Sequence, residues 1–189
     1  MSLIDAGSSS GGFTDCLLQR GARAVIAVEK GFNQLDFRLR RDARVAVLEK
    51  TSIMELSPER MPFPAQAAVA DLSLRSLRTA AAHILSLLAH GWLVALAKPQ
   101  YERVGCPPGS RITPLDREQV LDTLRKLVLD LSNEGLRVIR AAPSPIPGTK
   151  GNREFFFQIV RDSDAPGQPP GTSEVPCSLE QLVAEAFPG

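Results

Sequence analysis

Metal-binding and redox side chains are scarce in this sequence, which contains only two histidines and three cysteines. The cysteines, Cys16, Cys106 and Cys177, are far apart and odd in number, which suits a reducing cytoplasm and indicates neither a disulfide framework nor a zinc site. The histidines, His83 and His90, fall in or just after one predicted helix, and we interpret both as structural. We therefore expect no metal centre.

Long apolar runs and a large net charge are also missing. No run approaches the roughly 20 apolar residues that span a bilayer, and the first residues lack the basic region and apolar core of a signal peptide. We therefore expect a cytoplasmic protein without a membrane segment. The net charge of +1 is unlike that of a strongly basic RNA-binding protein. The length of 189 residues, with 43% hydrophobic and 23% charged residues, predicts one soluble α/β domain.

Short apolar runs alternate with amphipathic segments. Strands are predicted at residues 3–6, 24–29, 45–48, 67–71, 92–97, 136–142 and 154–160, and helices at 13–20, 33–40, 75–89 and 114–133. We expect Asn33 to cap the second helix and Pro114 to lie in the first turn of the last one. No long helix separates the last two strands, so they should pair antiparallel.

This order predicts a doubly wound, seven-stranded, mostly parallel sheet with one antiparallel strand, in a Rossmann-like α/β domain at residues 1–160. The Pro/Gly-rich segment that follows, residues 161–189, is expected to be a flexible tail. A short helix beginning at Ser178 could end it.

A glycine- and serine-rich stretch follows the first strand. Small residues let the backbone approach a ligand closely, and the free N–H groups of the next helix face the turn. The candidate cofactor-binding residues there are Asp5, Gly7, Ser8, Ser9, Gly11, Gly12 and Phe13. Ser9 stands where a dinucleotide fingerprint has its middle glycine, which weakens an NAD interpretation. Asp5 is placed to meet an ammonium group, such as that of S-adenosylmethionine.

Glu29 ends the second predicted strand, where an acidic residue is expected to bind ribose hydroxyls of an adenosine cofactor. Because NAD and S-adenosylmethionine both carry this ribose, Glu29 does not distinguish them. A glycine-rich turn without any ligand remains the alternative for the whole stretch.

Three further charged residues lie at predicted strand ends: Asp71, Lys98 and Glu154. Ligands bind at the carboxyl ends of parallel strands, and neighbouring strands lie ~4.8 Å apart. A lysine flanked by two carboxylates could accept a proton from a hydroxyl group. The alternative is an ordinary ion pair at the strand ends.

Together these motifs resemble those of the TlyA (hemolysin A-like) family of FtsJ-type RNA methyltransferases, over roughly residues 3–160. The matching segments include Gly11-Gly-Phe-Thr-Asp15, Lys98-Pro-Gln-Tyr-Glu102 and Lys150-Gly-Asn-Arg-Glu154. The resemblance implies methylation of a ribose 2′-hydroxyl, usually in ribosomal RNA, with S-adenosyl-L-methionine as cofactor. It makes Lys98 the base, supported by Asp71 and Glu154, as the last three members of a Lys-Asp-Lys-Glu tetrad.

The sequence also departs from the family pattern. The first lysine of the tetrad and a small RNA-binding domain lie upstream of the glycine motif in the family, in a region that this sequence does not contain. The loop after Glu102 carries Val104-Gly-Cys-Pro-Pro108 instead of a basic, glycine-rich run. These departures concern the base and the RNA contacts, and they affect the expected fold and cofactor less.

Several interpretations stay open. A basic cluster, Arg38, Arg40, Arg41 and Arg44, either contacts phosphates or forms a solvated helix face, and Lys150 is a further candidate for RNA contact. The chain could bind S-adenosylmethionine without transferring a methyl group, or be inactive without the upstream region. A nicotinamide-dependent enzyme is a third possibility, and membrane lysis, which the family's hemolysin name suggests, a remote one.

Overall fold

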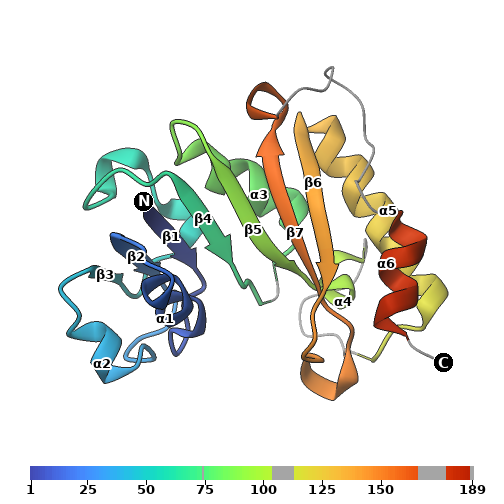
Figure 1. Cartoon of the computed structure of the whole chain (residues 1–189), viewed down its shortest axis with the longest axis horizontal. Coiled ribbons are helices and arrows are strands. Elements are labelled where there is room, and N and C mark those ends of the chain that lie inside the picture. Colours follow the sequence, from blue (N-terminus) through green and yellow to red (C-terminus); the bar gives the residue numbers. More distant parts are fainter. Residues whose placement is uncertain (74, 104–112, 166–177, 188–189) are drawn as a thin grey trace. The chain divides into compact units, whose positions relative to one another are not determined.

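The computed structural model describes residues 1–73, 75–103, 113–165 and 178–187. Its strands form one seven-stranded sheet in the order β3-β2-β1-β4-β5-β7-β6 (Figure 1). They are β1 (Ser2–Ala6), β2 (Ala24–Val28), β3 (Val45–Leu48), β4 (Ala67–Ala70), β5 (Trp92–Ala97), β6 (Leu136–Pro143) and β7 (Phe155–Arg161). The α-helices are α1 (Gly12–Gln19), α2 (Phe37–Arg40), α3 (Leu77–Ser86), α4 (Pro99–Glu102), α5 (Arg117–Asn133) and α6 (Leu179–Ala186). The sheet confirms the predicted strand number, and β6 and β7 confirm the antiparallel pair.

The chain divides into two compact units, of which the first contains residues 1–72 and 83–93. Within it β1 pairs in parallel with both β2 and β4, and β2 pairs with β3. Every residue of β1 is buried, as expected for a parallel strand covered on both faces. One core cluster of this unit is formed by Leu3, Leu18, Ala22, Val25, Ala27, Leu35, Leu39 and Ala67.

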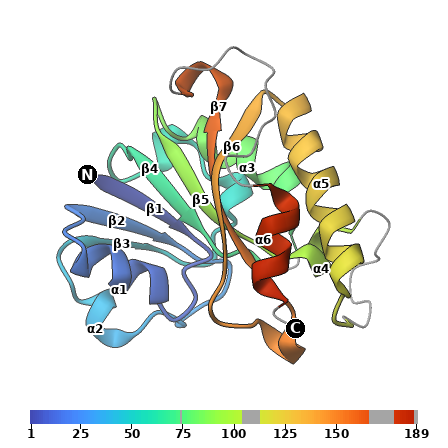
Figure 2. The ribbon, with the colours of Figure 1, turned by 45° about the vertical axis from the view of Figure 1, so that its right-hand side comes forward.

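The second unit contains residues 73–82 and the chain from Val94 onward. Helix α5 buries one apolar stripe, Val120, Leu124, Leu127 and Leu131, and packs against β6. Helix α6 lies against α5 and β6 (Figure 2). The Ser178 side chain caps α6 by accepting a hydrogen bond from the Gln181 N–H (3.1 Å), at the residue where the sequence predicts that helix to begin.

Two predicted helix starts were wrong. The helix expected at 33–40 spans only Phe37–Arg40, because the Asp36 side chain caps it and Asn33 adopts a left-handed conformation (φ 58°). The helix expected at 114–133 begins at Arg117, so Pro114 lies outside it. Its start is set by a capping box, in which the Asp116 carboxylate accepts the Gln119 N–H and the Gln119 side chain accepts the Asp116 N–H.

Smaller differences concern the neighbouring segments. The helix expected at 75–89 spans Leu77–Ser86, and the one-turn helix α4 ends at Glu102. Of the loop after Glu102, residues 104–112, which include Cys106, lie outside the described residues. No described helix combines the length and apolar character needed to cross a bilayer.

Candidate active site

The turn after β1 is held by backbone hydrogen bonds within the first unit. The N–H groups of Gly7 and Ser8 both donate to the Val28 carbonyl, at 2.9 and 3.1 Å. Gly7 has φ 80°, and a Cβ there would clash with the main-chain carbonyl of Asp71. Glycine is therefore required at position 7 both by backbone conformation and by close packing.

The other small residues of the stretch have different roles. Gly11 caps α1 in a left-handed conformation (φ 102°), and a Cβ there would clash with the side chains of Leu35 and Leu39. A Cβ on Gly12 would meet nothing within 4 Å, so there is open space beside the first residue of α1. Ser9 is exposed with φ 47°. Open space beside a helix N-terminus is what a polar cofactor needs.

Asp5 is a buried carboxylate at the end of β1, with 1% of its surface exposed. Its Oδ2 accepts a hydrogen bond from Thr14 Oγ1 on α1 (2.6 Å), while Oδ1 has no hydrogen-bond partner among the described residues. Burial raises the pKa of Asp5 from 3.8 to about 6 against the hydrogen bonds from Thr14, and the nearby charges of Asp71 and Glu29 raise it further. A buried carboxylate with a spare oxygen fits a cationic group such as an ammonium.

Glu29 follows β2 and links two turns. Its Oε2 accepts the Ser9 N–H (2.9 Å) and its Oε1 accepts the Gly31 N–H (2.7 Å). Each oxygen keeps a further lone pair, so the carboxylate can also accept ribose hydroxyls. The first unit thus contains all the cofactor-binding residues that the sequence predicts: Asp5, Gly7, Ser8, Ser9, Gly11, Gly12, Phe13, Glu29 and Asp71.

The three predicted catalytic residues lie at element ends. Asp71 directly follows β4, and its N–H donates to the Ala6 carbonyl (3.0 Å). Lys98 follows β5 as the N-cap residue of α4, and Glu154 directly precedes β7. The Glu154 side chain lies against Gly148, where an added Cβ would meet its carboxylate. Asp71 belongs to the first unit, and Lys98 and Glu154 belong to the second.

A buried network around Glu102, which the sequence did not reveal, lies in the second unit. Glu102 is the last residue of α4 and is 2% exposed. Its carboxylate accepts hydrogen bonds from the Leu77 N–H (2.8 Å) and from Ser76 Oγ, and lies beside the Arg78 guanidinium. Burial raises the pKa of Glu102, while these hydrogen bonds and the charge of Arg78 oppose the rise. The only signal for this network in the sequence is the glutamate that ends the Lys-Pro-Gln-Tyr-Glu motif.

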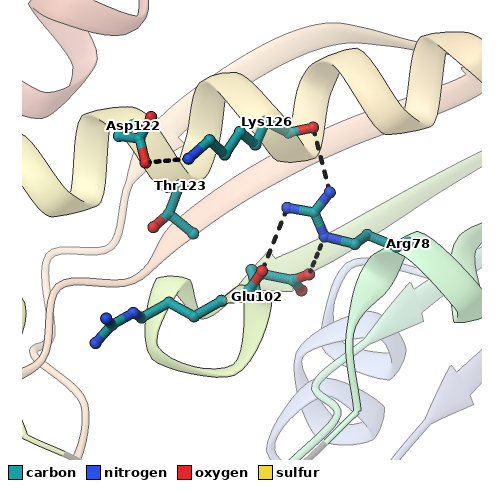
Figure 3. Close-up of a pocket in the computed structure, with 6 residues that line it drawn as sticks. Arg78, Glu102, Asp122, Thr123 and Lys126 are labelled. Carbon is teal, nitrogen blue, oxygen red and sulfur yellow. Dashed lines mark hydrogen bonds and ion pairs between the residues drawn. The ribbon is translucent and has the colours of Figure 1, made fainter. Parts of the chain in front are cut away.

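Two residues of this network, Glu102 and Arg78, also line a pocket of about 360 Å³ (Figure 3). The pocket is lined by Arg78, Glu102, Arg103, Asp122, Thr123 and Lys126. Lys126 pairs with Asp122 one helical turn away (2.7 Å). Because cationic and acidic side chains both line the pocket, it has no strong preference for an anion or a cation.

The predicted basic cluster is partly neutralised by its own neighbours. Arg38, Arg40 and Arg44 form ion pairs with Asp36, Glu49 and Asp42, respectively. The Arg41 guanidinium lies over the ring of Phe37 (5.2 Å to the centroid), and Lys50 Nζ over the ring of Phe32 (4.4 Å). Both phenylalanines are 66% exposed, so this surface combines cations with accessible aromatic rings.

His83 Nε2 lies within hydrogen-bond distance of the carbonyls of Ile53 (2.9 Å) and Leu56 (3.1 Å), which is a structural role, as predicted. Among the described residues, no group of three or more His, Cys, Asp or Glu side chains could hold a metal ion.

Comparison with known proteins gives consistent matches. The family model described as FtsJ-like methyltransferase matches residues 1–161. The chain is 37% identical over 166 residues to the 16S/23S rRNA (cytidine-2′-O)-methyltransferase TlyA of Mycobacterium tuberculosis (strain CDC 1551 / Oshkosh), covering 85% of this chain and 60% of that protein. The chain spans 57% and 60% of the length of two such curated relatives.

Solved structures of other proteins also resemble the fold of this chain. A protein described as a candidate hemolysin from Streptococcus thermophilus superposes with a TM-score of 0.84 at 31% identity, over 98% of this chain and 66% of that chain. An S-adenosylmethionine dependent methyltransferase from Mesorhizobium loti superposes with a TM-score of 0.56 at 17% identity, over 85% of this chain and 90% of that chain. The second likeness concerns the fold alone.

Proposed function

Because the chain belongs to the FtsJ-like methyltransferase family, we propose that it transfers a methyl group from S-adenosylmethionine to a ribose 2′-hydroxyl of ribosomal RNA. The observation that carries the proposal is the buried Asp5 carboxylate, with one oxygen accepting a hydrogen bond from Thr14 and the other without a hydrogen-bond partner among the described residues. It lies at the start of the turn that the family motif identifies. An ammonium group supplies both the charge and the donors that this carboxylate can use.

The residues of the first unit fit this cofactor. Asp5 would hold its ammonium group, the N–H groups at the start of α1 its carboxylate, and Glu29 its ribose hydroxyls. S-adenosylmethionine supplies a methyl group on a positively charged sulfur. The protein's contribution to methyl transfer is mostly the alignment of that carbon with the attacking oxygen.

Lys98 is the proposed base. Its neutral amine accepts the 2′-hydroxyl proton as the oxygen bonds to the methyl carbon and the carbon–sulfur bond breaks. Asp71 and Glu154 are proposed to orient Lys98 and to balance its charge after the proton transfer. The resemblance of their motifs to those of the FtsJ-type enzymes supports these roles.

The segment from Lys30 to Lys50 is the proposed RNA contact. It holds six Lys or Arg and three Asp or Glu residues, a net charge of +3 in a chain whose total is +1. The exposed rings of Phe32 and Phe37 can stack on unpaired bases, since every base has a π-face. This distribution of charge favours RNA contact over a merely solvated face for the basic cluster.

Calorimetric titration with S-adenosylmethionine, with NAD as the control, tests the cofactor. Transfer of tritiated methyl groups to isolated small and large ribosomal subunits tests the reaction. Binding without transfer would support a cofactor-binding protein that lacks methyl transfer, and binding of NAD instead would contradict the proposal.

Substitution Lys98→Ala tests the base. We expect methyl transfer to fall by at least about 100-fold, a typical contribution of general base catalysis, while cofactor affinity stays unchanged. Lys126→Ala is the matched control, because it removes an exposed lysine side chain from α5 (62% exposed). An unchanged rate in Lys98→Ala would refute the proposed role of Lys98.

A further inference from the structure

Helix α4 is a single turn with Lys98 at one end and Glu102 at the other. Lys98 is its N-cap residue, Glu102 is its last residue, and the Tyr101 N–H donates to the Lys98 carbonyl (2.8 Å). One helical turn is too short to be stable by itself, since helix nucleation is unfavourable. The backbone at Lys98 is held on one side by β5, and the turn on its other side depends on contacts that hold the far end of α4.

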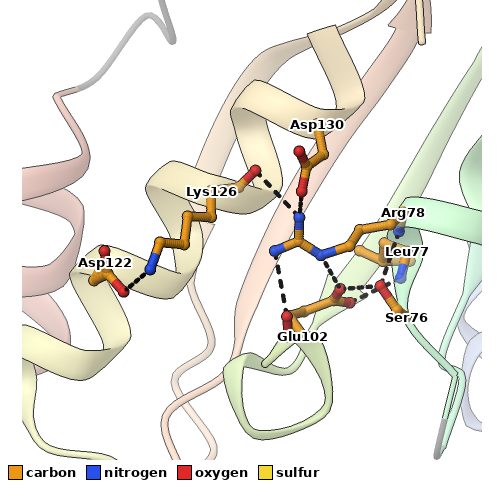
Figure 4. Close-up of polar contacts among 7 residues, drawn as sticks. All are labelled: Ser76, Leu77, Arg78, Glu102, Asp122, Lys126 and Asp130. Carbon is orange, nitrogen blue, oxygen red and sulfur yellow. Dashed lines mark hydrogen bonds and ion pairs between the residues drawn. The ribbon is translucent and has the colours of Figure 1, made fainter. Parts of the chain in front are cut away.

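Those contacts are provided by the start of α3. The Glu102 carboxylate accepts the Leu77 N–H (2.8 Å) and the Ser76 hydroxyl, and thereby caps α3 from outside that helix. In return, Arg78 Nη2 donates to the main-chain carbonyl of Glu102 (3.2 Å). Each of the two short segments thus satisfies backbone groups of the other (Figure 4).

Arg78 extends the network to α5. Its Nη1 donates to the Lys126 carbonyl (3.3 Å) and pairs with the Asp130 carboxylate. The Arg78 side chain is 15% exposed and that of Glu102 is 1% exposed. A buried charged pair gives little net stability compared with apolar residues of similar volume, so its value lies in fixing one geometry. Here the fixed geometry is that of the turn that begins at Lys98.

We propose that Glu102 is a positioning residue for Lys98, acting through its contacts with Ser76, Leu77 and Arg78. The inference rests on the proposed function, because it takes Lys98 as the base. Ser76 follows Asp71 by five positions, and Glu102 follows Lys98 by four. The contact therefore acts, within the second unit, on the short helix that begins at the candidate base Lys98.

The test is the variant Glu102→Gln, with Asp122→Asn as its matched control. Both convert a carboxylate into an amide and both line the same pocket. Asp122 differs in being 61% exposed, and its ion pair in the described part of the chain is with Lys126 on the same helix. We expect Glu102→Gln to lower kcat for methyl transfer by about 10- to 100-fold, as for a catalytic group displaced by about 1 Å. The KM for S-adenosylmethionine should stay within about twofold of the unaltered chain, and Asp122→Asn should change neither value.

Unchanged kcat in Glu102→Gln would overturn the inference, and so would equal losses in kcat and in cofactor affinity, which indicate a general structural defect. If Glu102→Gln does not fold, Ser76→Ala decides, since it removes one donor and keeps the carboxylate. A fall in kcat for Ser76→Ala at constant KM supports the inference, and an unchanged kcat contradicts it.

A readout that needs no activity separates this inference from the proposed function. Reductive methylation with ¹³C-formaldehyde labels the five lysines, Lys30, Lys50, Lys98, Lys126 and Lys150. We expect the ¹³C signal of Lys98 to shift in Glu102→Gln and to stay in place in Asp122→Asn. If the unaltered chain methylates no RNA, the proposed function fails, while the Lys98 signal still decides the positioning role; an unmoved signal contradicts it.

Discussion

The titration of Asp5 should make cofactor binding and folding stability depend on pH in opposite directions. Burial raises the pKa of Asp5 from 3.8 to about 6, so the folded protein without cofactor favours the protonated carboxyl. This contribution to the free energy of unfolding is complete at pH values below the pKa of Asp5 in the unfolded chain. It is lost as the pH rises through the pKa of Asp5 in the folded protein. The difference corresponds to about 3 kcal/mol in full, since one pKa unit is worth about 1.4 kcal/mol.

The ammonium group of S-adenosylmethionine requires the ionised carboxylate instead. At pH 5 about one tenth of the Asp5 side chains are ionised if the pKa is about 6. The affinity for S-adenosylmethionine should therefore be about tenfold lower at pH 5 than at pH 7.5. The free energy of unfolding of the cofactor-free chain should fall as the pH rises from 5 to 7.5.

Calorimetry at several pH values and urea unfolding measure the two effects. In Asp5→Asn, cofactor affinity should be weak and independent of pH. The free energy of unfolding of the unaltered chain should fall by about 2 kcal/mol relative to Asp5→Asn between pH 4.5 and 7.5. Asp15→Asn is the control, since Asp15 is exposed and bonds Gln19 (2.7 Å) on the same helix. An affinity that does not change between pH 5 and 7.5 would refute this reasoning.

Two further predictions concern the turn and the RNA surface. Gly7→Ala should lower the free energy of unfolding by about 2 kcal/mol or more, because it adds a clash with Asp71 to a left-handed backbone; urea unfolding measures it, and Gly21→Ala, with a similar φ of 85° and no neighbour within 4 Å, should cost clearly less. Arg41→Ala should weaken binding to ribosomal RNA and reduce the slope of log affinity against log salt by about one, as for one lost phosphate contact; filter binding at several salt concentrations checks it, and an unchanged slope would contradict it.

Short strands were predictable where an apolar run is bounded on both sides. Residues 45–48 and 92–97 were placed at their observed limits, because turn-forming or polar residues flank them. The start of α2 could not be predicted in this way, because Asn33 and Asp36 are both residue types that commonly cap a helix. Only the Asp36 side chain meets the Arg38 N–H in the fold (2.8 Å).

Those residues of the candidate site that stand at the end of a strand could be predicted from the sequence. Asp5 and Glu29 could be chosen because both stand at the carboxyl ends of parallel strands, where ligands of such sheets bind. The contact of Glu102 with the start of α3 joins residues 25 and 26 positions apart. No local pattern encodes such a contact, because it depends on how α3 and α4 pack within their unit.

The hydrogen bonds of Glu29 affect the conformational entropy that cofactor binding costs. Its carboxylate is fastened by the Ser9 N–H and the Gly31 N–H, from turns that follow different strands. Both turns and Glu29, the residue proposed to bind the ribose, are therefore ordered when the chain folds, before a cofactor binds. The cost of ordering them falls on folding rather than on association, so less of the cofactor's binding energy is consumed by rigidifying the protein.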